Sequence, residues 1–203
     1  SEQMYLVLTD LIDKRVTYAG SKLYDNRIIK QYRVSFVPFV SGLEDMLFML
    51  DYLMYADFMV IRDYNNYVYR VGYSVDVLSV RINSFPAEYA AFSNFLERVY
   101  VYQKKFNLED SSLDRTWNSL TVFFHKVILA IYKPEHKYTR QERLSFLNQV
   151  LFSDKELIRR FFLPQYKADV LGKFLFCRVG ASAFEGCMRF LSGIKFKKMI
   201  GAK

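Results

Sequence analysis

The chain has 203 residues, of which 52% are hydrophobic and 25% are charged, and its formal net charge is +8. This length suits one domain or two small ones, and the hydrophobic share is sufficient for a folded core. No apolar run reaches the roughly 18 residues of a membrane-spanning helix, and no secretory signal is visible. The positive charge favours an anionic membrane surface or a phosphate-bearing substrate. Nucleic acid is not an expected partner, because zinc-finger spacing, an RNP-like sequence and long Lys/Arg tracts are lacking.

Two helices are predicted in the first 35 residues. Glu2–Lys14 and Ser21–Tyr32 both place apolar residues at helical spacing. Lys22 stands at the start of the second helix. A lysine there is either a solvated side chain or a contact for a phosphate group, and the residues alone leave both readings open.

A third helix is predicted to follow a loop around Gly42. The apolar run from Met46 to Ala56 is too long for an ordinary strand, and Glu44 and Asp45 precede it. Carboxylates in a first turn face unpaired backbone N–H groups and the positive end of the helix dipole, which stabilises them by about 0.3–1 kcal/mol. The pair can therefore serve as helix caps alone, or as groups that accept a proton or a sugar hydroxyl.

Two extended segments are predicted after this helix, at Phe58–Ile61 and Tyr67–Val71. The second places Tyr69 on one face and Arg70 on the other. Arg70 can orient an anion with two parallel hydrogen bonds, or it can be an exposed strand residue. Short strands of this kind leave an edge that another chain can pair with, so a homodimer is an open possibility.

From Phe85 onward the pattern is helical throughout. Thr139 with Glu142 resembles a capping box, and glycines near 180 and 186 are expected to interrupt the last helix. The predicted helices are Ala87–Lys105, Leu113–Tyr132, Arg140–Phe152, Asp154–Phe162 and Lys167–Ile200. The fold class is therefore predicted to be α+β and mostly α, with one domain at residues 1–84 and a helical domain at 85–203.

The residues that bind metals or form disulfides are few. His125 and His136 have no Cys, His or acidic partner at ligand spacing, so no metal site is expected in the chain. Cys177 and Cys187 are too few for a disulfide framework, which favours a reducing cytoplasm. The segment Cys187–Lys203 is basic and amphipathic. It can lie on an anionic membrane surface, or it can pack as a terminal helix with a solvated lysine edge.

An ordered series of short motifs spans about residues 18 to 80 and resembles the second half of the catalytic domain of family 2 glycosyltransferases. These are inverting enzymes with the GT-A fold. The series consists of Lys22-Leu23-Tyr24, Ile28-Ile29, Phe36, Glu44-Asp45 with Phe48, and Tyr67-Val68-Tyr69-Arg70. No single motif is specific, but their order and spacing together are.

The resemblance implies transfer of a sugar from a nucleotide-sugar donor to a glycan or lipid-linked acceptor, as in the synthesis of surface polysaccharides. Asp45 would be the base that takes the proton of the acceptor hydroxyl, and Glu44 would orient the acceptor. Lys22, Tyr69 and Arg70 would contact substrate.

A nucleotide-binding half with an Asp-x-Asp motif is not found in the sequence. That half would hold the divalent cation, Mg or Mn. We therefore expect the chain to be the acceptor-side part of such an enzyme, to bind no cation itself and to be inactive alone. The expected location is the cytoplasm, with peripheral attachment to the inner face of the membrane left open. The alternative is a helical interaction or membrane-surface module without enzymatic activity.

Overall fold

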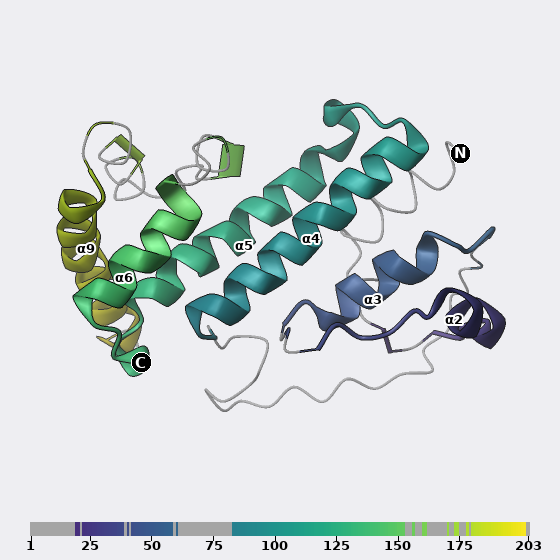
Figure 1. Ribbon diagram of the computed structural model, residues 1–203, viewed down its shortest axis with the longest axis horizontal. Coiled ribbons are helices and arrows are strands. Elements are labelled where there is room, and N and C mark those ends of the chain that lie inside the picture. The colour runs from purple at the N-terminus through teal and green to yellow at the C-terminus, as the bar shows by residue number, and fades with distance from the viewer. Residues whose placement is uncertain are drawn as a thin grey trace. The chain divides into compact units, whose positions relative to one another are not determined.

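The computed structural model (Figure 1) describes residues 19–20, 22–38, 40, 42–58, 60, 83–152, 156, 160–161, 170, 173–174, 178 and 180–201. These residues form helices and connecting segments and contain no β-strand, so the predicted mostly α composition is confirmed. A mixed layer like that of the GT-A fold is not seen in them. Phe58 and Val60 are exposed and outside regular structure. The rest of the two predicted strands and the predicted helix Glu2–Lys14 lie outside the described residues.

The chain forms two compact units that interleave along the sequence. Among the described residues, the first unit combines those between 19 and 60 with 90–117, and the second combines 83–89 with those between 118 and 201. Helices α4 (Phe85–Phe106) and α5 (Asp114–Tyr132) therefore contribute to both units. The domain boundary predicted at residue 84 stays a prediction.

In the first unit, α2 (Asn26–Tyr32) is shorter than the predicted helix Ser21–Tyr32. Asp25 caps its N-terminus, because the Asp25 side chain accepts a hydrogen bond of 2.8 Å from the backbone N–H of Arg27. This cap places the helix start five residues later than the apolar pattern predicts. The helix ends at Arg33, which has a left-handed backbone conformation with φ 55°.

Helix α3 (Glu44–Leu53) follows and buries one apolar face in the first unit. The prediction that Glu44 and Asp45 lie in its first turn is confirmed. Its end precedes the predicted one at Ala56 by three residues. Five of its apolar side chains are buried, namely Leu47, Phe48, Met49, Leu50 and Leu53.

Helix α4 was predicted at Ala87–Lys105 and is two residues longer at its start and one at its end. It stops at Asn107, which has φ 49°, and the backbone N–H of Leu108 donates to the carbonyl of Gln103. The segment after α4 contains the short 3₁₀ helix η1 (Asp110–Leu113), which leads into α5. The ring of Tyr100 then lies 5.9 Å from that of Trp117.

In the second unit, α5 ends at Tyr132, before the 3₁₀ turn η2 (Pro134–His136), as the proline predicts. The capping box is confirmed: Thr139 accepts from the backbone N–H of Glu142, whose carboxylate accepts from the backbone N–H of Thr139. It begins α6 (Arg140–Leu147), which continues as the π-helical segment η3 (Asn148–Phe152).

The predicted helical region Lys167–Ile200 is interrupted at Gly180, as expected, and α9 (Ala181–Gly201) begins after it. Most of residues 167–179 and of the predicted helix Asp154–Phe162 lie outside the described residues. The predicted interruption at Gly186 is wrong, because α9 passes through it. Glycine in a helix costs about 1 kcal/mol relative to alanine. Burial of the flanking Phe184, Glu185 and Met188 offsets that cost.

Candidate functional site

The N-terminus of α3 is shaped by the glycine loop before it. Gly42 has φ 89°, a conformation that side-chain-bearing residues rarely adopt, and Leu43 occupies the N-cap position without a side-chain hydrogen bond. The carboxylate of Glu44 instead turns back and accepts a hydrogen bond from the backbone N–H of Gly42. Glu44 therefore holds the loop against the helix and leaves its neighbour Asp45 as the carboxylate available for other contacts.

Asp45 is half-buried and lies beside the segment that precedes α2. Burial and the negative charge of Glu44 raise the pKa of Asp45 above its ordinary value. A hydrogen bond from the backbone N–H of Ala19 and the positive charge of Lys22 act in the opposite direction. The result is a carboxylate with a greater affinity for a proton than an exposed aspartate has.

Lys22 is the second predicted site residue in this cluster. Its pKa is lowered by burial, and the negative charge of Asp45 opposes that shift. Its ammonium group donates a hydrogen bond of 3.2 Å to the carbonyl of Gly20. The structure thus brings together two of the residues that the motif series selected, which lie 23 positions apart in the chain.

Tyr24 completes the cluster, and the sequence did not single it out as a site residue. Its hydroxyl donates to the carbonyl of Ala19 at 2.6 Å and contacts the sulfur of Met49 at 3.0 Å. Its ring meets those of Phe48 and Tyr52 edge-on, at centroid distances of 5.3 and 5.0 Å. Burial, followed by the charge of Asp45, raises the pKa of Tyr24 to about 12, so the phenol keeps its proton. Its position within the Lys-Leu-Tyr motif was the available signal.

The remaining predicted substrate contacts, Tyr69 and Arg70, lie outside the described residues. The structure therefore describes three of the five predicted site residues, and all three lie at the start of α3 or beside it.

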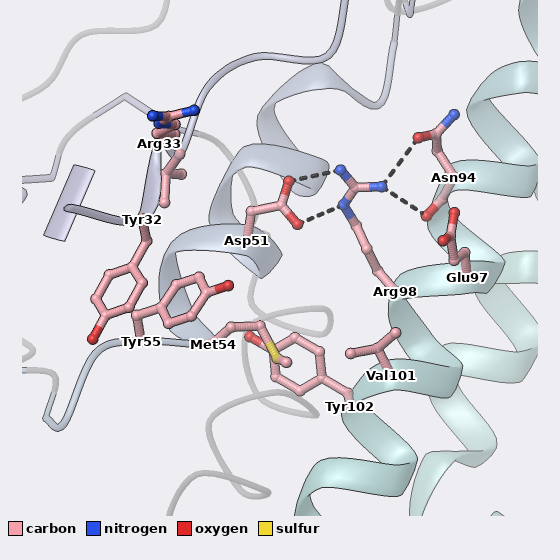
Figure 2. A pocket seen from close by; sticks show the side chains of 11 residues that line it. Tyr32, Arg33, Asp51, Met54, Tyr55, Asn94, Glu97, Arg98, Val101 and Tyr102 are labelled. Carbon is pink, nitrogen blue, oxygen red and sulfur yellow. Dashed lines mark hydrogen bonds and ion pairs between the residues drawn. The ribbon is translucent and has the colours of Figure 1, made fainter. Parts of the chain in front are cut away.

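A second feature of the first unit is a pocket of about 390 Å³ between α2, α3 and α4. Figure 2 shows Asp51 on α3 bonded directly to Arg98 on α4, and both residues line the pocket. The guanidinium group donates from Nε to Oδ1 of Asp51 at 2.7 Å and from Nη2 to Oδ2 at 2.6 Å. Its Nη1 donates at 3.1 Å to both the carbonyl and the side-chain oxygen of Asn94. This network is partly exposed to solvent.

Two tyrosines form another wall of the pocket. Tyr32 and Tyr55 stack with their ring centroids 3.8 Å apart and their planes within 5° of parallel. Both remain more than two-fifths exposed, at 43% and 42%. The ammonium group of Lys105 lies 5.6 Å from the Tyr55 ring centroid and donates to the carbonyl of Met54.

These contacts also fix how α3 is held. The Asp51–Arg98 pair, the hydrogen bond of 2.7 Å from the Tyr102 hydroxyl to the carbonyl of Leu50, and the Lys105 contact all join α3 to α4. The helix that carries Asp45 in its first turn is therefore anchored by a helix that the sequence assigned to the following domain. Sequence reasoning did not select any of these residues, since each partner lies about 50 positions away.

Within the described part of the chain, no group of three or more His, Cys, Asp or Glu side chains could hold a metal ion. None of the helices described is both long enough and apolar enough to cross a bilayer. Comparisons of the chain with models of protein families, with curated proteins and with solved structures found no match.

Proposed function

We propose that this chain is the acceptor-side part of an inverting glycosyltransferase and that Asp45 is its catalytic base. The observation that carries the proposal is the environment of Asp45: a half-buried carboxylate at the start of α3 with a raised pKa, beside Lys22. A base is most effective when its pKa approaches the working pH without leaving it protonated. The pKa of Asp45 is shifted in that direction.

The chemistry proposed is a single displacement. The Asp45 carboxylate takes the proton of an acceptor hydroxyl while the hydroxyl oxygen attacks the anomeric carbon of the donor sugar. The bond between that carbon and the nucleoside diphosphate breaks, and the diphosphate leaves with the electron pair. The configuration at the anomeric carbon inverts because attack and departure occur on opposite faces. General-base assistance of this kind is typically worth about 10²–10⁴-fold in rate.

The other residues of the cluster have supporting roles in this proposal. Lys22 favours the ionised form of Asp45, since its positive charge acts against the pKa shift that burial and Glu44 cause. Glu44 holds the glycine loop that precedes Asp45. A nucleotide-binding half supplies the donor and its divalent cation, and the acceptor is a glycan or a lipid-linked glycan. We propose the same enzyme to lie in the cytoplasm or at the inner surface of the membrane.

The test uses a longer protein, encoded by the same reading frame, in which this chain is joined to a nucleotide-binding half. Release of nucleoside diphosphate from a panel of UDP- and GDP-sugars is measured for the parent and for Asp45→Asn. We expect Asp45→Asn to lower kcat by 10² or more and to leave donor binding and melting temperature nearly unchanged. The matched control is Asp57→Asn, which removes an exposed carboxylate from the segment after α3.

Transfer by Asp45→Asn within a few-fold of the parent would limit Asp45 to capping the helix. If the upstream reading frame encodes no Asp-x-Asp motif, there is no donor-binding half, and the chain is better explained as a non-enzymatic interaction module. The 203-residue chain alone is expected to turn over no nucleotide sugar.

A further inference from the structure

The pocket between α2, α3 and α4 is separate from the Asp45 cluster in its residues and in its chemistry. Asp45 contacts the segment that precedes α2, whereas Asp51 faces α4. The pocket's volume of about 390 Å³ lies within the range of about 300–1,000 Å³ that is typical of small-molecule sites. Such sites are usually lined by apolar groups, but this one is lined by charged and hydroxyl-bearing groups as well. A polar ligand therefore suits it better than an apolar one.

The charges of the lining residues balance. Arg33 and Arg98 are cationic, and Asp51 and Glu97 are anionic. An anion would meet the two carboxylates, and a cation would meet the two guanidinium groups. A ligand without net charge avoids both repulsions, whatever the chain's overall charge of +8.

Hydrogen-bond donors and acceptors lie side by side in the pocket. A guanidinium group has five N–H donors. The contacts to Asp51 and Asn94 use Nε–H, one N–H of Nη2 and both N–H groups of Nη1, so one N–H of Nη2 is left over among the described contacts. The Asp51 oxygens retain further lone pairs next to it. This N–H donor and the neighbouring carboxylate acceptor together match two adjacent hydroxyl groups of a sugar ring, one of which accepts a hydrogen bond while the other donates one.

The stacked tyrosines add the surface that a sugar ring uses. The apolar face of a pyranose, formed by its C–H groups, packs well on an aromatic ring. The hydroxyl groups of Tyr32 and Tyr55 make no hydrogen bond to the described residues, so both can bond to a ligand. In Figure 2 the hydroxyl of Tyr55 points toward the side of the pocket that carries Asp51.

We propose that this pocket binds a neutral saccharide, with Asp51 and Arg98 bonded to neighbouring hydroxyls and the tyrosine pair against the ring. This proposal goes beyond the transferase proposal and does not depend on it. Binding here requires no donor half and no base. In an enzyme that acts on a glycan, such a pocket would hold a sugar unit of the acceptor chain away from the reacting hydroxyl.

The test uses the 203-residue chain and ¹H–¹⁵N NMR. Methyl glycosides of glucose, galactose, mannose and N-acetylglucosamine are titrated in turn, with glucuronic acid and glucosamine as charged comparators. We expect at least one neutral glycoside to shift the amide signals of residues 51–55 and 94–102. Tyr55→Ala should weaken that binding about tenfold, the change produced by a contact of roughly 1.4 kcal/mol. Asp51→Asn should weaken it similarly.

Two controls separate this site from the rest of the molecule. Tyr100→Ala removes a tyrosine on α4 that is 43% exposed, as Tyr32 is, but does not line the pocket, and it should bind like the parent. Asp45→Asn should also bind like the parent, so loss of transfer and loss of saccharide binding are independent results. The proposal fails if no neutral glycoside shifts these amides, if only a charged comparator does, or if Tyr55→Ala retains full binding.

Discussion

Arg98 on α4 and Asp51 on α3 form a bidentate ion pair with donor–acceptor distances of 2.7 and 2.6 Å. The Arg98 side chain is 18% exposed and that of Asp51 is 29% exposed, so solvent screens the pair only in part. The planar fork of the guanidinium group matches both oxygens of the carboxylate, which a lysine cannot do. The pair is therefore expected to contribute to the stability of the first unit.

Arg98→Lys tests this contribution. The substitution keeps the positive charge and removes the second hydrogen bond to Asp51 and the bonds to Asn94. We expect it to lower the free energy of unfolding by about 1–2 kcal/mol, measured by urea denaturation. Arg27→Lys is the matched control, since Arg27 pairs with Asp25 on the surface, and it should change stability little. Equal effects of the two substitutions would show that the pair does not hold α3.

The pKa of Asp45 can be measured directly in this chain from the ¹³C shift of its carboxyl group. We expect a midpoint above the ordinary aspartate value of about 3.9, because burial and Glu44 disfavour the charged form. Lys22→Met should raise the midpoint further by removing the positive charge beside it. Lys30→Met removes an exposed lysine of α2 and should not move it. A midpoint at or below the ordinary value would contradict the proposed role of Asp45.

Asp45 should also make stability depend on pH in a definite direction. Its folded-state pKa is raised, so the folded state binds the proton more tightly than the unfolded state does. The stabilisation is complete below the unfolded pKa and is lost as pH rises through the folded pKa. At neutral pH, Asp45→Asn should therefore be as stable as the parent or more so, and the advantage should shrink on acidification. Melting temperatures of the parent and of Asp45→Asn, measured from pH 3 to about 7, would show this change in their stability difference. A mutant destabilised at neutral pH would instead identify Asp45 as a cap.

Glu185 connects α9 to α6 in the second unit. Its buried carboxylate accepts from Nε of Arg143 at 2.7 Å and lies 3.5 Å from Nε of Arg140. Glu185→Leu leaves the buried Arg143 guanidinium with the carbonyl of Tyr138 but without a carboxylate to balance its charge, and we expect a loss of about 3–5 kcal/mol in unfolding free energy. The double variant Arg143→Met with Glu185→Leu should recover much of it, since no buried charge is then unpaired. Additive losses in this cycle would exclude direct coupling of the pair.

Tyr132 and Tyr102 should respond in opposite directions to removal of the hydroxyl. The buried hydroxyl of Tyr132 has no hydrogen-bond partner among the described residues, whereas that of Tyr102 donates to the carbonyl of Leu50. Tyr132→Phe should raise the unfolding free energy by about 1 kcal/mol, and Tyr102→Phe should lower it by a similar amount. Urea denaturation of both variants provides the measurement, and a loss of stability in Tyr132→Phe would place an ordered water or another partner on its hydroxyl.

The sequence predicted the elements whose signals are local. Helix α4 follows from apolar residues three and four positions apart, and the start of α6 follows from Thr139 and Glu142, which cap each other across one turn. The position of Asp45 in the first turn of α3 was likewise visible from the residues around it. The start of α2 was misplaced because the cap at Asp25 overrides the apolar pattern before it.

The parts that were not predicted depend on contacts between distant residues. Nothing adjacent to Asp51 in the sequence indicates that its partner is Arg98, and nothing near Tyr24 indicates that its ring packs on α3. The break expected at Gly186 failed for a similar reason, because burial of neighbouring side chains outweighs the local cost of glycine. Local sequence propensity determines where helices form, whereas tertiary packing determines which helices contact one another.

The division of α4 between the two units affects how the protein emerges from the ribosome. The partners that hold α3 lie far downstream: Arg98 follows Asp51 by 47 positions, and Tyr102 follows Leu50 by 52. A nascent chain that ends at residue 84 contains Asp45 and all of α3, but none of the α4 side chains that secure them. The first unit therefore has to wait for synthesis of α4, by which time residues 83–89 of the second unit have already been made. Helix α4 thus begins the second unit and supplies the partners of the first during the same stretch of synthesis.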